Sequence, residues 1–296
     1  MTKIKAVNVK KVFKIRKNGN EFDKLQALDG VNLEIDQGEF MVIVGPSGCG
    51  KSTFLDLVGG LTFPDEGTIS IDGKAIGGPG LDRATVFQQN ALFPWRTTLE
   101  NVEFGLENIN QNKDDRREIA LDYLSLVGLS GYHNHYPYQL SGGMKQRVSI
   151  ARALALNPEI LLMDEPLAAL DAQTREFLQR DILRIAKESH KTVLFITHSI
   201  DEAVFLGDKV AVMSARPGVI KQVLDIPLSI EDRFGDDVAA SQEFMQSRQI
   251  LWRLLKEEVV KVQEAQTKSQ TAAISQSPIR SSGNNLLNSV RALTKI

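Results

Sequence analysis

The chain has 296 residues, of which 42% are apolar and 24% charged, so it can form a sizeable globular core and wholesale disorder is excluded. At roughly 150 residues per domain, this length predicts two structural units. No apolar run approaches the roughly 18 residues of a membrane-spanning helix, and Cys49 is the only cysteine, which excludes an intrachain disulfide. The start of the chain also lacks a long apolar segment, so the sequence predicts a protein of the reducing cytoplasm that cannot span a bilayer by itself.

The net charge of −2 conceals a segregation of charge along the chain. Residues 1–20 hold seven Lys and Arg residues and no acid, and residues 265–296 hold four and no acid, which leaves 24 basic against 37 acidic residues in the body. Because a broad nucleic-acid-binding face must neutralise phosphates, this acidic body argues against one. The basic ends either contact anionic lipid headgroups or are simply solvated.

Taken in chain order, the hydrophobic pattern first predicts strands. Residues 4–12 and 27–35 alternate apolar and polar side chains, as half-buried antiparallel strands do, and the polar loop 17–20 lies between them. Residues 40–44 are continuously apolar, which is typical of a strand buried on both faces, and a glycine-rich turn leads from them into a helix at 51–58. This strand, turn and helix open a βαβ unit.

The middle of the chain is mainly helical. An interrupted helical pattern covers residues 99–156, after which Asn157 and Pro158 stop it. Two further buried strands are predicted at 159–163 and 192–196, with a helix at 171–188 between them. Up to about residue 225 the sequence therefore predicts one α/β unit with a helical insertion.

The pattern changes after Pro227. Apolar residues near helical spacing predict a helix within 240–264, and from residue 265 Ser, Thr, Gln, Asn and Ala dominate, so we expect disorder there, with at most a short amphipathic helix at 286–293. The predicted divisions are the main domain at 1–226, a helical extension at 227–264 and a basic tail at 265–296.

A phosphate-binding loop follows the first buried strand. Residues 45–52 read Gly-Pro-Ser-Gly-Cys-Gly-Lys-Ser and match G-x-x-x-x-G-K-[ST] between a predicted strand and a predicted helix. The glycines let backbone N–H groups close around phosphate oxygens, Lys51 would neutralise the β- and γ-phosphates, and the Ser52 hydroxyl would bind Mg²⁺. The predicted nucleotide-contacting residues of this segment are Gly45, Pro46, Ser47, Gly48, Cys49, Gly50, Lys51, Ser52 and Thr53.

The role of Cys49 has two interpretations. Its side chain is either a small filler of the loop or a thiol whose pKa is lowered by the adjacent helix N-terminus. The sequence leaves open whether this thiol is reactive.

Two acids end the second buried strand. Asp164 and Glu165 follow four apolar residues, which places them at the carboxyl edge of a sheet, where ligands of open α/β sheets bind. Asp164 would hold Mg²⁺ through water, and Glu165 would orient or deprotonate an attacking water. The phosphate-binding loop and the acid pair indicate a nucleoside triphosphatase or a kinase and do not choose between them.

Residues 140–147 distinguish between a nucleoside triphosphatase and a kinase. They read Leu-Ser-Gly-Gly-Met-Lys-Gln-Arg and, running into 148–154, resemble the signature motif of ATP-binding cassette (ABC) ATPases. Physically they are a second small-residue turn at a helix N-terminus, and hence a second anion site. The resemblance implies that Ser141 and Gly143 of one subunit, with Gly142 between them, cap the γ-phosphate held by Lys51 of a second subunit.

The resemblance assigns roles to further positions. It implies that Gln88 contacts Mg²⁺ and the attacking water, that His198 contacts the γ-phosphate, that Phe13 stacks on adenine, and that Asp171 belongs to the D-loop. With the phosphate-binding loop and the acid pair, the predicted catalytic residues are therefore Glu165, His198, Gln88 and Lys51. The predicted metal-binding residues are Ser52, Gln88 and Asp164, and of these six residues Gln88 and His198 rest on the resemblance.

The match covers residues 4–226 and implies the fold of the ABC ATPase cassette, an α/β P-loop NTPase core with an antiparallel β-subdomain and a helical subdomain insertion. Met144 replaces the commoner glutamine of the signature, and Ala168 replaces a commoner serine of the D-loop. Both variants look like the importer branch for nitrate, sulfonate, taurine and bicarbonate. Phe-Pro-Trp-Arg at 93–96 and Ala-Arg-Pro-Gly at 215–218 look like the same branch.

The resemblance implies that the chain is the ATP-hydrolysing subunit of an importer for a small anion such as nitrate, bicarbonate, a sulfonate or taurine. Its expected partners are a transmembrane permease, a second cassette, identical or paralogous, and, indirectly, a periplasmic or lipoprotein substrate-binding protein, with no nucleic acid. The expected location is peripheral, on the cytoplasmic face of the inner membrane. Residues 88–95 would contact the permease, although the apolar residues 92–95 are equally interpretable as core.

Two other classes compete with this interpretation. A soluble ABC ATPase would act in DNA repair, Fe–S assembly or translation, and the acidic body and the importer-like Phe-Pro-Trp segment argue against it. A P-loop kinase is disfavoured by the signature motif and by His198. The expected cofactors are ATP and Mg²⁺ in either ABC class.

Overall fold

The structure is a computed structural model, and it describes residues 1–16, 22–109, 112–235 and 237–275, with side chains through residue 262. The chain divides after Val259 into two compact units, of which the first is Met1–Val259. Every site discussed below lies in the first unit. The predicted polar loop at 17–20 lies outside the described residues.

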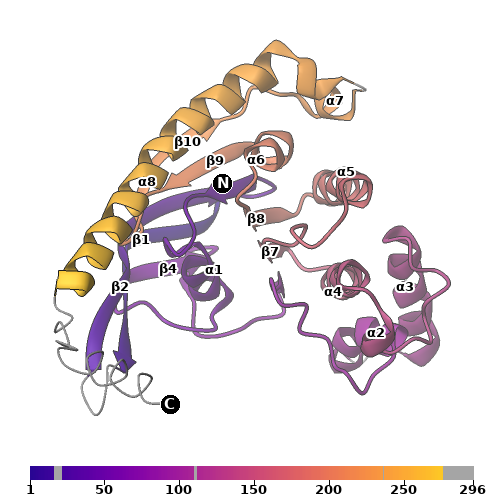
Figure 1. Cartoon of the computed structure of the whole chain (residues 1–296). Helices are drawn as coiled ribbons and strands as arrows, with labels where there is room; N and C mark the ends of the chain where they lie inside the picture. The colour runs from indigo at the N-terminus through magenta and orange to yellow at the C-terminus, as the bar shows by residue number, and fades with distance from the viewer. Residues whose placement is uncertain (17–21, 110–111, 236, 276–296) are drawn as a thin grey trace, which may run out of the picture. The chain divides into compact units, whose positions relative to one another are not determined.

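Strands predominate in the first part of the described chain, and three helices in succession separate β6 from β7 (Figure 1). The strands are β1 (Thr2–Arg16), β2 (Phe22–Asp36), β3 (Phe40–Val44), β4 (Glu66–Ile71), β5 (Lys74–Ala75), β6 (Arg83–Val86), β7 (Ile160–Asp164), β8 (Thr192–Ile196), β9 (Lys209–Met213) and β10 (Ile220–Asp225). The helices are α1 (Lys51–Gly59), α2 (Thr98–Asn108), α3 (Lys113–Leu126), α4 (Gly142–Ala155), α5 (Ala172–Glu188), α6 (Ile200–Leu206), α7 (Ile230–Phe234) and α8 (Gln242–Ser275), with short 3-10 turns at Pro137–Gln139 and Val238–Ala240.

A mainly parallel sheet forms the centre of the first unit. In the described residues its six strands lie in the order β10-β9-β3-β8-β7-β6, and only the edge strand β10 is antiparallel to its neighbour. All residues of β3 and β8 are buried, which agrees with their continuously apolar sequences. Because β6, β7, β8, β3 and β9 run the same way, their carboxyl ends meet at one edge of the sheet.

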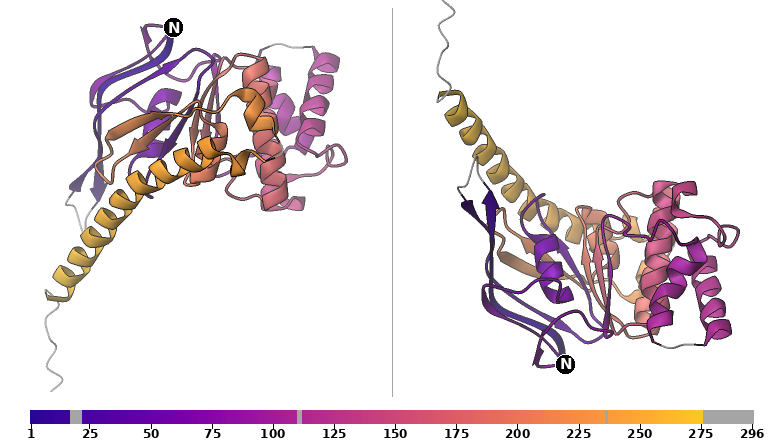
Figure 2. Two further views of the ribbon diagram at one scale, coloured as in Figure 1. Left: turned by 90° about the horizontal axis from the view of Figure 1, so that it is seen from above. Right: turned by 90° about the horizontal axis from the view of Figure 1, so that it is seen from below.

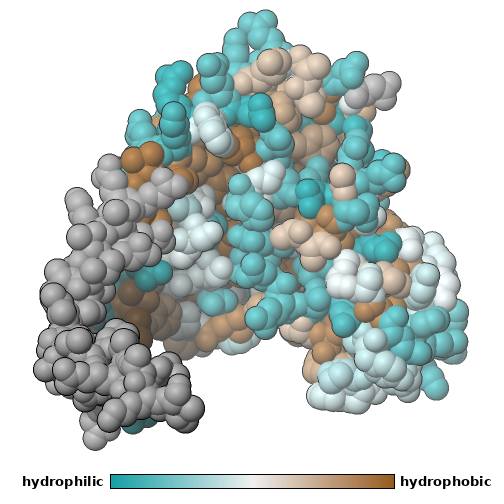
Figure 3. All heavy atoms as spheres, viewed as in Figure 1, coloured by the Kyte–Doolittle hydropathy of each residue, from teal (hydrophilic) through white to brown (hydrophobic). Residues whose placement is uncertain are grey.

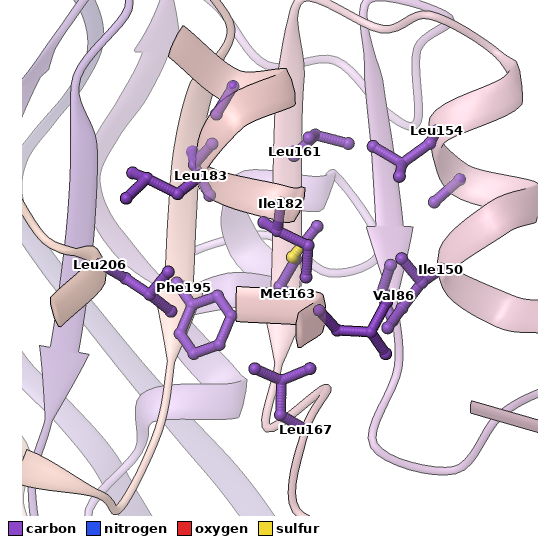
Figure 4. Packing of buried hydrophobic residues seen from close by; sticks show 14 of the residues in the cluster. Val86, Ile150, Leu154, Leu161, Met163, Leu167, Ile182, Leu183, Phe195 and Leu206 are labelled. Atoms are coloured by element: carbon purple, nitrogen blue, oxygen red, sulfur yellow. The ribbon is translucent and has the colours of Figure 1, made fainter. Parts of the chain in front are cut away.

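The two faces of this sheet belong to two apolar clusters. Phe40 and Val42 of β3 join one cluster and Met41 and Ile43 join the other, as expected when successive strand residues point to opposite faces. The second cluster includes α1 and the antiparallel strands. Figure 4 shows the first, in which strand residues pack against helices α4, α5 and α6 through Val86, Ile150, Leu154, Leu161, Met163, Ile182, Leu183, Phe195 and Leu206.

A second sheet is antiparallel, with strand order β2-β1-β4-β5. Strands β1 and β2 pair from Thr2 opposite Asp36 to Arg16 opposite Phe22, which confirms the predicted antiparallel strands and extends both. The sequence predicted shorter strands because the apolar alternation fades where the side chains are exposed, whereas the backbone ladder continues there.

The predicted helical insertion is confirmed by α2, α3 and α4, which lie together beside the central sheet (Figure 2). Local capping explains where two of these helices begin. Thr97 and Glu100 form a reciprocal capping box at α2, and the Ser141 hydroxyl accepts a hydrogen bond from the Met144 N–H at α4. The signature segment therefore lies at a helix N-terminus, as its small residues indicate.

The C-terminal helix is longer than the sequence predicted. The predicted range was 240–264, with disorder from 265, whereas α8 continues through Ser275. Residues 265–275 contain no Gly or Pro, and their Ala, Gln and Lys residues favour helix, so nothing in that stretch stops it. Residues 276–296, including the predicted short helix at 286–293, lie outside the described residues.

The helix α8 also contributes to the core of the first unit. Phe244 and Leu251 are 4% and 0% exposed and belong to the first cluster. The face of the chain seen in Figure 3 is mostly hydrophilic, as expected when the apolar side chains of both clusters lie inside. None of the helices in the described part of the chain is long and apolar enough to cross a membrane.

Candidate functional site

Five loops follow the carboxyl ends of neighbouring parallel strands. In sheet order, Arg216 follows β9, the loop 45–50 follows β3, His198 follows β8, Glu165 follows β7 and Gln88 follows β6. Ligands of open α/β sheets bind at this edge. The strand order thus brings together side chains that are far apart in the sequence.

These loops line one cavity of about 550 Å³. It lies between the central sheet's carboxyl edge and residues of β1 and β2. Its lining residues are Phe13, Leu25, Ala27, Ser47, Gly48, Gly50, Lys51, Ser52, Thr53, Gln88, Glu165, His198 and Arg216.

The phosphate-binding loop has the geometry that its sequence predicts. Gly50 precedes α1 with a φ of +113°, and a Cβ there would lie 2.7 Å from Leu28 Cδ2, so both conformation and space require glycine. The Lys51 ammonium is buried within the loop and donates to the carbonyl oxygens of Gly45 and Pro46 at 2.9 and 3.1 Å. A cation and the N-terminus of a nine-residue helix therefore face the same space, which suits a bound phosphate.

The oxygen atoms beside this loop fit a magnesium ion. Burial and the charge of Glu165 raise the pKa of Asp164, while the nearby Ser52 hydroxyl and the charge of Lys51 lower it. A cation at this carboxylate would favour its ionised form. Hydroxyl and carboxylate oxygens are the hard ligands that Mg²⁺ prefers.

Glu165 is held at the centre of the edge by contacts from two other strands. Its Oε2 lies 3.3 Å from Nε2 of Gln88 and 3.3 Å from Nδ1 of His198. Its backbone has a φ of +45°, which is uncommon for a residue with a side chain, and its N–H donates to the carbonyl oxygen of Ile196 at 3.0 Å. A carboxylate fixed in this way beside a phosphate site is able to accept a proton from water.

Cys49 is a buried filler. Its side chain is 1% exposed, and burial raises the pKa of the thiol even though Lys51 Nζ lies 3.9 Å from the sulfur and acts in the opposite direction. Of the two interpretations drawn from the sequence, the lowered thiol pKa is wrong. Helix proximity is outweighed here by the loss of solvent around the sulfur.

Phe13 marks the apolar end of the cavity. Its ring is 39% exposed and lies with Leu25 and Ala27 of β2 along the lining. The Lys11 ammonium is 5.6 Å from the ring centroid on the same strand. A partly exposed ring at the end of a phosphate site offers a flat surface to a base.

The signature and D-loop residues lie elsewhere. Gly142 and Gly143 begin α4, and Asp171 caps α5 by accepting the Thr174 N–H at 3.0 Å, a bond that also lowers the pKa of Asp171. Of the described residues that line the cavity, none comes from residues 141–143 or from Asp171. Within one chain, the structure therefore separates the two predicted anion sites.

The sequence left open whether residues 92–95 are core or a contact surface for the permease, and their burial differs along the segment. Leu92 packs against the first cluster, whereas Trp95 is 71% exposed and contacts the Phe93 ring at a centroid distance of 5.5 Å. Leu92 is thus partly buried against the core, whereas Trp95 is exposed.

Sequence reasoning missed three lining residues. Leu25 and Ala27 carry no motif, and Arg216 was noted only as part of a branch-like segment. The signal that would have found Arg216 is its place just after a strand parallel to β3, since that position lies at the binding edge.

Comparison with known proteins agrees with this geometry. The ABC transporter family matches residues 28–168. An ABC transporter ATP-binding protein of Methanocaldococcus jannaschii is 52% identical over 260 residues, covering 88% of this chain and 93% of the relative. Taurine import ATP-binding proteins of Pelagibacter ubique and Yersinia pestis are 40% and 47% identical, covering 87% and 70% of this chain and 98% and 81% of the relatives.

Solved structures give the same result. A dimeric bacterial ABC transporter cassette is 38% identical with a TM-score of 0.70, and it covers 76% of this chain and all of its own. A dimeric cassette in a post-hydrolysis state bound to ADP and Pi is 37% identical with a TM-score of 0.69 and the same coverage. The chain therefore belongs to the ATP-hydrolysing, ATP-binding subunits of ABC transporters, in the same branch as the taurine import ATP-binding proteins.

Proposed function

We propose that this ABC ATPase energises the uptake of a small anion, such as nitrate, bicarbonate, a sulfonate or taurine, through a separate transmembrane permease. The observation that carries the proposal is the similarity to taurine import ATP-binding proteins over most of the chain. The exposed Trp95, in the segment that follows Gln88 in the chain, supports a docking surface for the permease. A substrate-binding protein would act through the permease, and the cassette would lie at the cytoplasmic face of the inner membrane.

The chain's own residues supply the steps of hydrolysis in this proposal. Lys51 exchanges the carbonyls of Gly45 and Pro46 for the β- and γ-phosphates, as Phe13 stacks on the base. Glu165 accepts a proton from the attacking water, while Gln88 and His198 orient its carboxylate. Ser52, Asp164 and Gln88 would hold Mg²⁺, which when bound would neutralise charge on the phosphate oxygens.

Two cassettes would act together. The signature residues Ser141 and Gly143 lie outside the cavity of their own chain, which supports a head-to-tail pair in which each cavity is completed by a second subunit. The dimeric state of the similar cassettes supports the same arrangement. Closure around nucleotide would then drive the permease, because the closed state binds nucleotide more tightly.

The test uses the complex isolated with its permease. Affinity purification of the tagged chain from membranes, followed by native mass spectrometry, should find a polytopic permease. Trp95→Ala should weaken this association and remove the stimulation of ATPase by the permease, while basal ATPase is kept because Trp95 does not line the nucleotide cavity.

The control is Tyr138→Ala, since Tyr138 is also an exposed aromatic, at 75%, but lies in the 3-10 turn Pro137–Gln139. Recovery of a DNA-repair, Fe–S or ribosomal complex in place of a permease would overturn the transport assignment. Normal association of the Trp95→Ala chain would overturn the assigned contact alone.

A further inference from the structure

The loop after β9 contacts the phosphate-binding loop through Arg216. The guanidinium donates from Nε and Nη2 to the carbonyl oxygen of Gly48, at 3.0 and 2.9 Å. Gly48 has a φ of +74°, a conformation that glycine adopts and leaves easily. Because the Gly48 carbonyl and the Cys49 N–H belong to one planar peptide unit, a bond that holds the carbonyl also fixes the direction of that N–H.

Gly218 holds the backbone of the same loop against the site. Its N–H donates to the Ala27 carbonyl oxygen at 2.9 Å, and its own carbonyl accepts the Asp29 N–H at 3.1 Å. A side chain at position 218 would collide with the carbonyl oxygen of Cys49. The loop therefore lies directly on the phosphate-binding loop and on the strand that supplies Ala27 to the cavity.

The C-terminal helix holds the loop from its other side. The Glu258 carboxylate of α8 is 1% exposed and accepts the Ala215 N–H at 2.8 Å and the Lys221 ammonium at 2.7 Å. Burying a carboxylate is costly unless such partners satisfy it. The position of Ala215, and hence the direction in which Arg216 leaves the backbone, thus depends on α8.

We propose that Arg216 is a positioning residue for the nucleotide phosphates and that Glu258 keeps it in place, so that the C-terminal helix sets the nucleotide affinity of the cassette. The proposal rests on the nucleotide site described above and adds a route by which the C-terminal extension controls it. It is independent of the transported substrate and of the permease, so failure of the transport assignment leaves its test unchanged.

The first test compares Arg216→Ala with Arg216→Lys in the full-length chain. With a fluorescent ATP analogue and Mg²⁺ as the probe, Arg216→Ala should weaken binding roughly tenfold or more, because the Gly48 peptide is no longer preorganised by Arg216 and must be ordered when the phosphates bind. Lysine should restore only part of the affinity, because it lacks the two-donor fork that meets the Gly48 carbonyl. KM for ATP should rise by a larger factor than kcat falls.

A second readout needs no nucleotide. In the free protein, Arg216→Ala should speed amide hydrogen exchange at residues 48–50 and alkylation of Cys49, because the Gly48–Cys49 peptide then keeps, among the described residues, only the long bond from the Cys49 N–H to the Pro46 carbonyl oxygen, at 3.3 Å. Arg184→Ala, which removes an exposed arginine paired with Asp181 on α5, is the matched control and should leave both rates unchanged. Wild-type exchange and affinity in Arg216→Ala would overturn the proposal.

The role of Glu258 is tested by comparing the losses of nucleotide affinity in single and double variants. Glu258→Ala should weaken analogue binding in the same direction, and Glu258→Gln less so, because an amide oxygen still accepts the Ala215 N–H. Glu257→Ala is the control, since Glu257 contacts the same Lys221 at 3.6 Å from an exposed position.

If Glu258 acts through Arg216, the double variant should bind no more weakly than Arg216→Ala alone. Additive losses in the double variant, or a Glu258→Gln chain that is less stable yet shows unchanged affinity and unchanged exchange at 48–50, would overturn the coupling.

Discussion

Glu165 shows how three separate strands define the chemistry of one side chain. Its carboxylate receives contacts from Gln88 after β6 and His198 after β8, and its own position after β7 has a left-handed backbone. Each partner lies 3.3 Å from the same oxygen, Oε2. The protein's own side chains therefore orient this carboxylate, which is a condition for an effective general base.

Glu165→Gln should keep ATP binding and lose most turnover, by about 10² to 10⁴, since an amide cannot accept the proton of the attacking water. Size-exclusion chromatography with ATP should show a trapped dimer of the variant. Glu188→Gln, an exposed change at the end of α5, is the control. Unchanged steady-state hydrolysis would exclude Glu165 as the base.

Cys49 gives a second prediction at this scale. Because burial raises its thiol pKa, the reactive thiolate is scarce at neutral pH, and iodoacetamide should react slowly with the folded chain and faster as pH rises. The unfolded chain should react faster at every pH below the folded-state pKa.

Stoichiometric alkylation should abolish hydrolysis, because the side chain is 1% exposed and an adduct on the sulfur would displace the phosphate-binding loop around it. Prebound ATP should protect the thiol. The chain has a single cysteine, so mass spectrometry gives the stoichiometry directly, and full activity of the labelled protein would contradict the prediction.

At the scale of elements, the first turns of helix α8 are part of the core of the cassette. Leu251 and Phe244 belong to the same apolar cluster as the central sheet. The predicted boundary between residues 226 and 227 stays a prediction about function. In the structure, buried side chains of α8 pack in the same apolar cluster as the residues before that boundary.

Leu251→Ala should lower the free energy of unfolding by about 2 to 5 kcal/mol, because it leaves a cavity in the core. Ile250→Ala is the matched control, since Ile250 is 43% exposed, and should change stability by no more than about 0.5 kcal/mol. Urea unfolding followed by circular dichroism measures both. Equal stability of the two variants would mean that α8 does not pack on the sheet in solution.

At the scale of the whole molecule, the separation of the signature from the cavity of its own chain sets the expected assembly. The cavity is lined by Lys51 and Glu165 but by no residue of 141–143. A head-to-tail pair would place the signature of each chain over the cavity of the other, and this arrangement predicts complementation between two inactive variants.

Lys51→Ala and Gly143→Asp homodimers should each be inactive, because both of their composite sites lack one half. Mixing the two proteins should restore about a quarter of wild-type ATPase, since half of the dimers are mixed and each holds one complete site of two. The control mixes Lys51→Ala with Glu165→Gln, whose defects lie in the same half-site. No activity in the first mixture would contradict the head-to-tail arrangement.

The sequence determined the parts of this protein that depend on interactions between residues close together in the chain. The phosphate-binding loop, the acids after β7 and the signature turn are contiguous segments in which glycines, caps and charges fix the backbone and its ligand chemistry together. The two sheets and the helical insertion also followed from short-range patterns of burial. Where exposure removed the pattern, as at the ends of β1 and β2 and beyond residue 264, the predicted limits were too short.

Only the tertiary structure decided which distant residues meet. The strand order of the central sheet places Gln88, Glu165 and His198 around one oxygen and Arg216 beside Gly48, and no local pattern encodes that order. Burial likewise reversed one interpretation of Cys49 and joined Glu258 of the last helix to the loop of Arg216. Solvent exposure and strand neighbours depend on the whole fold, because they are set by segments far apart in the chain.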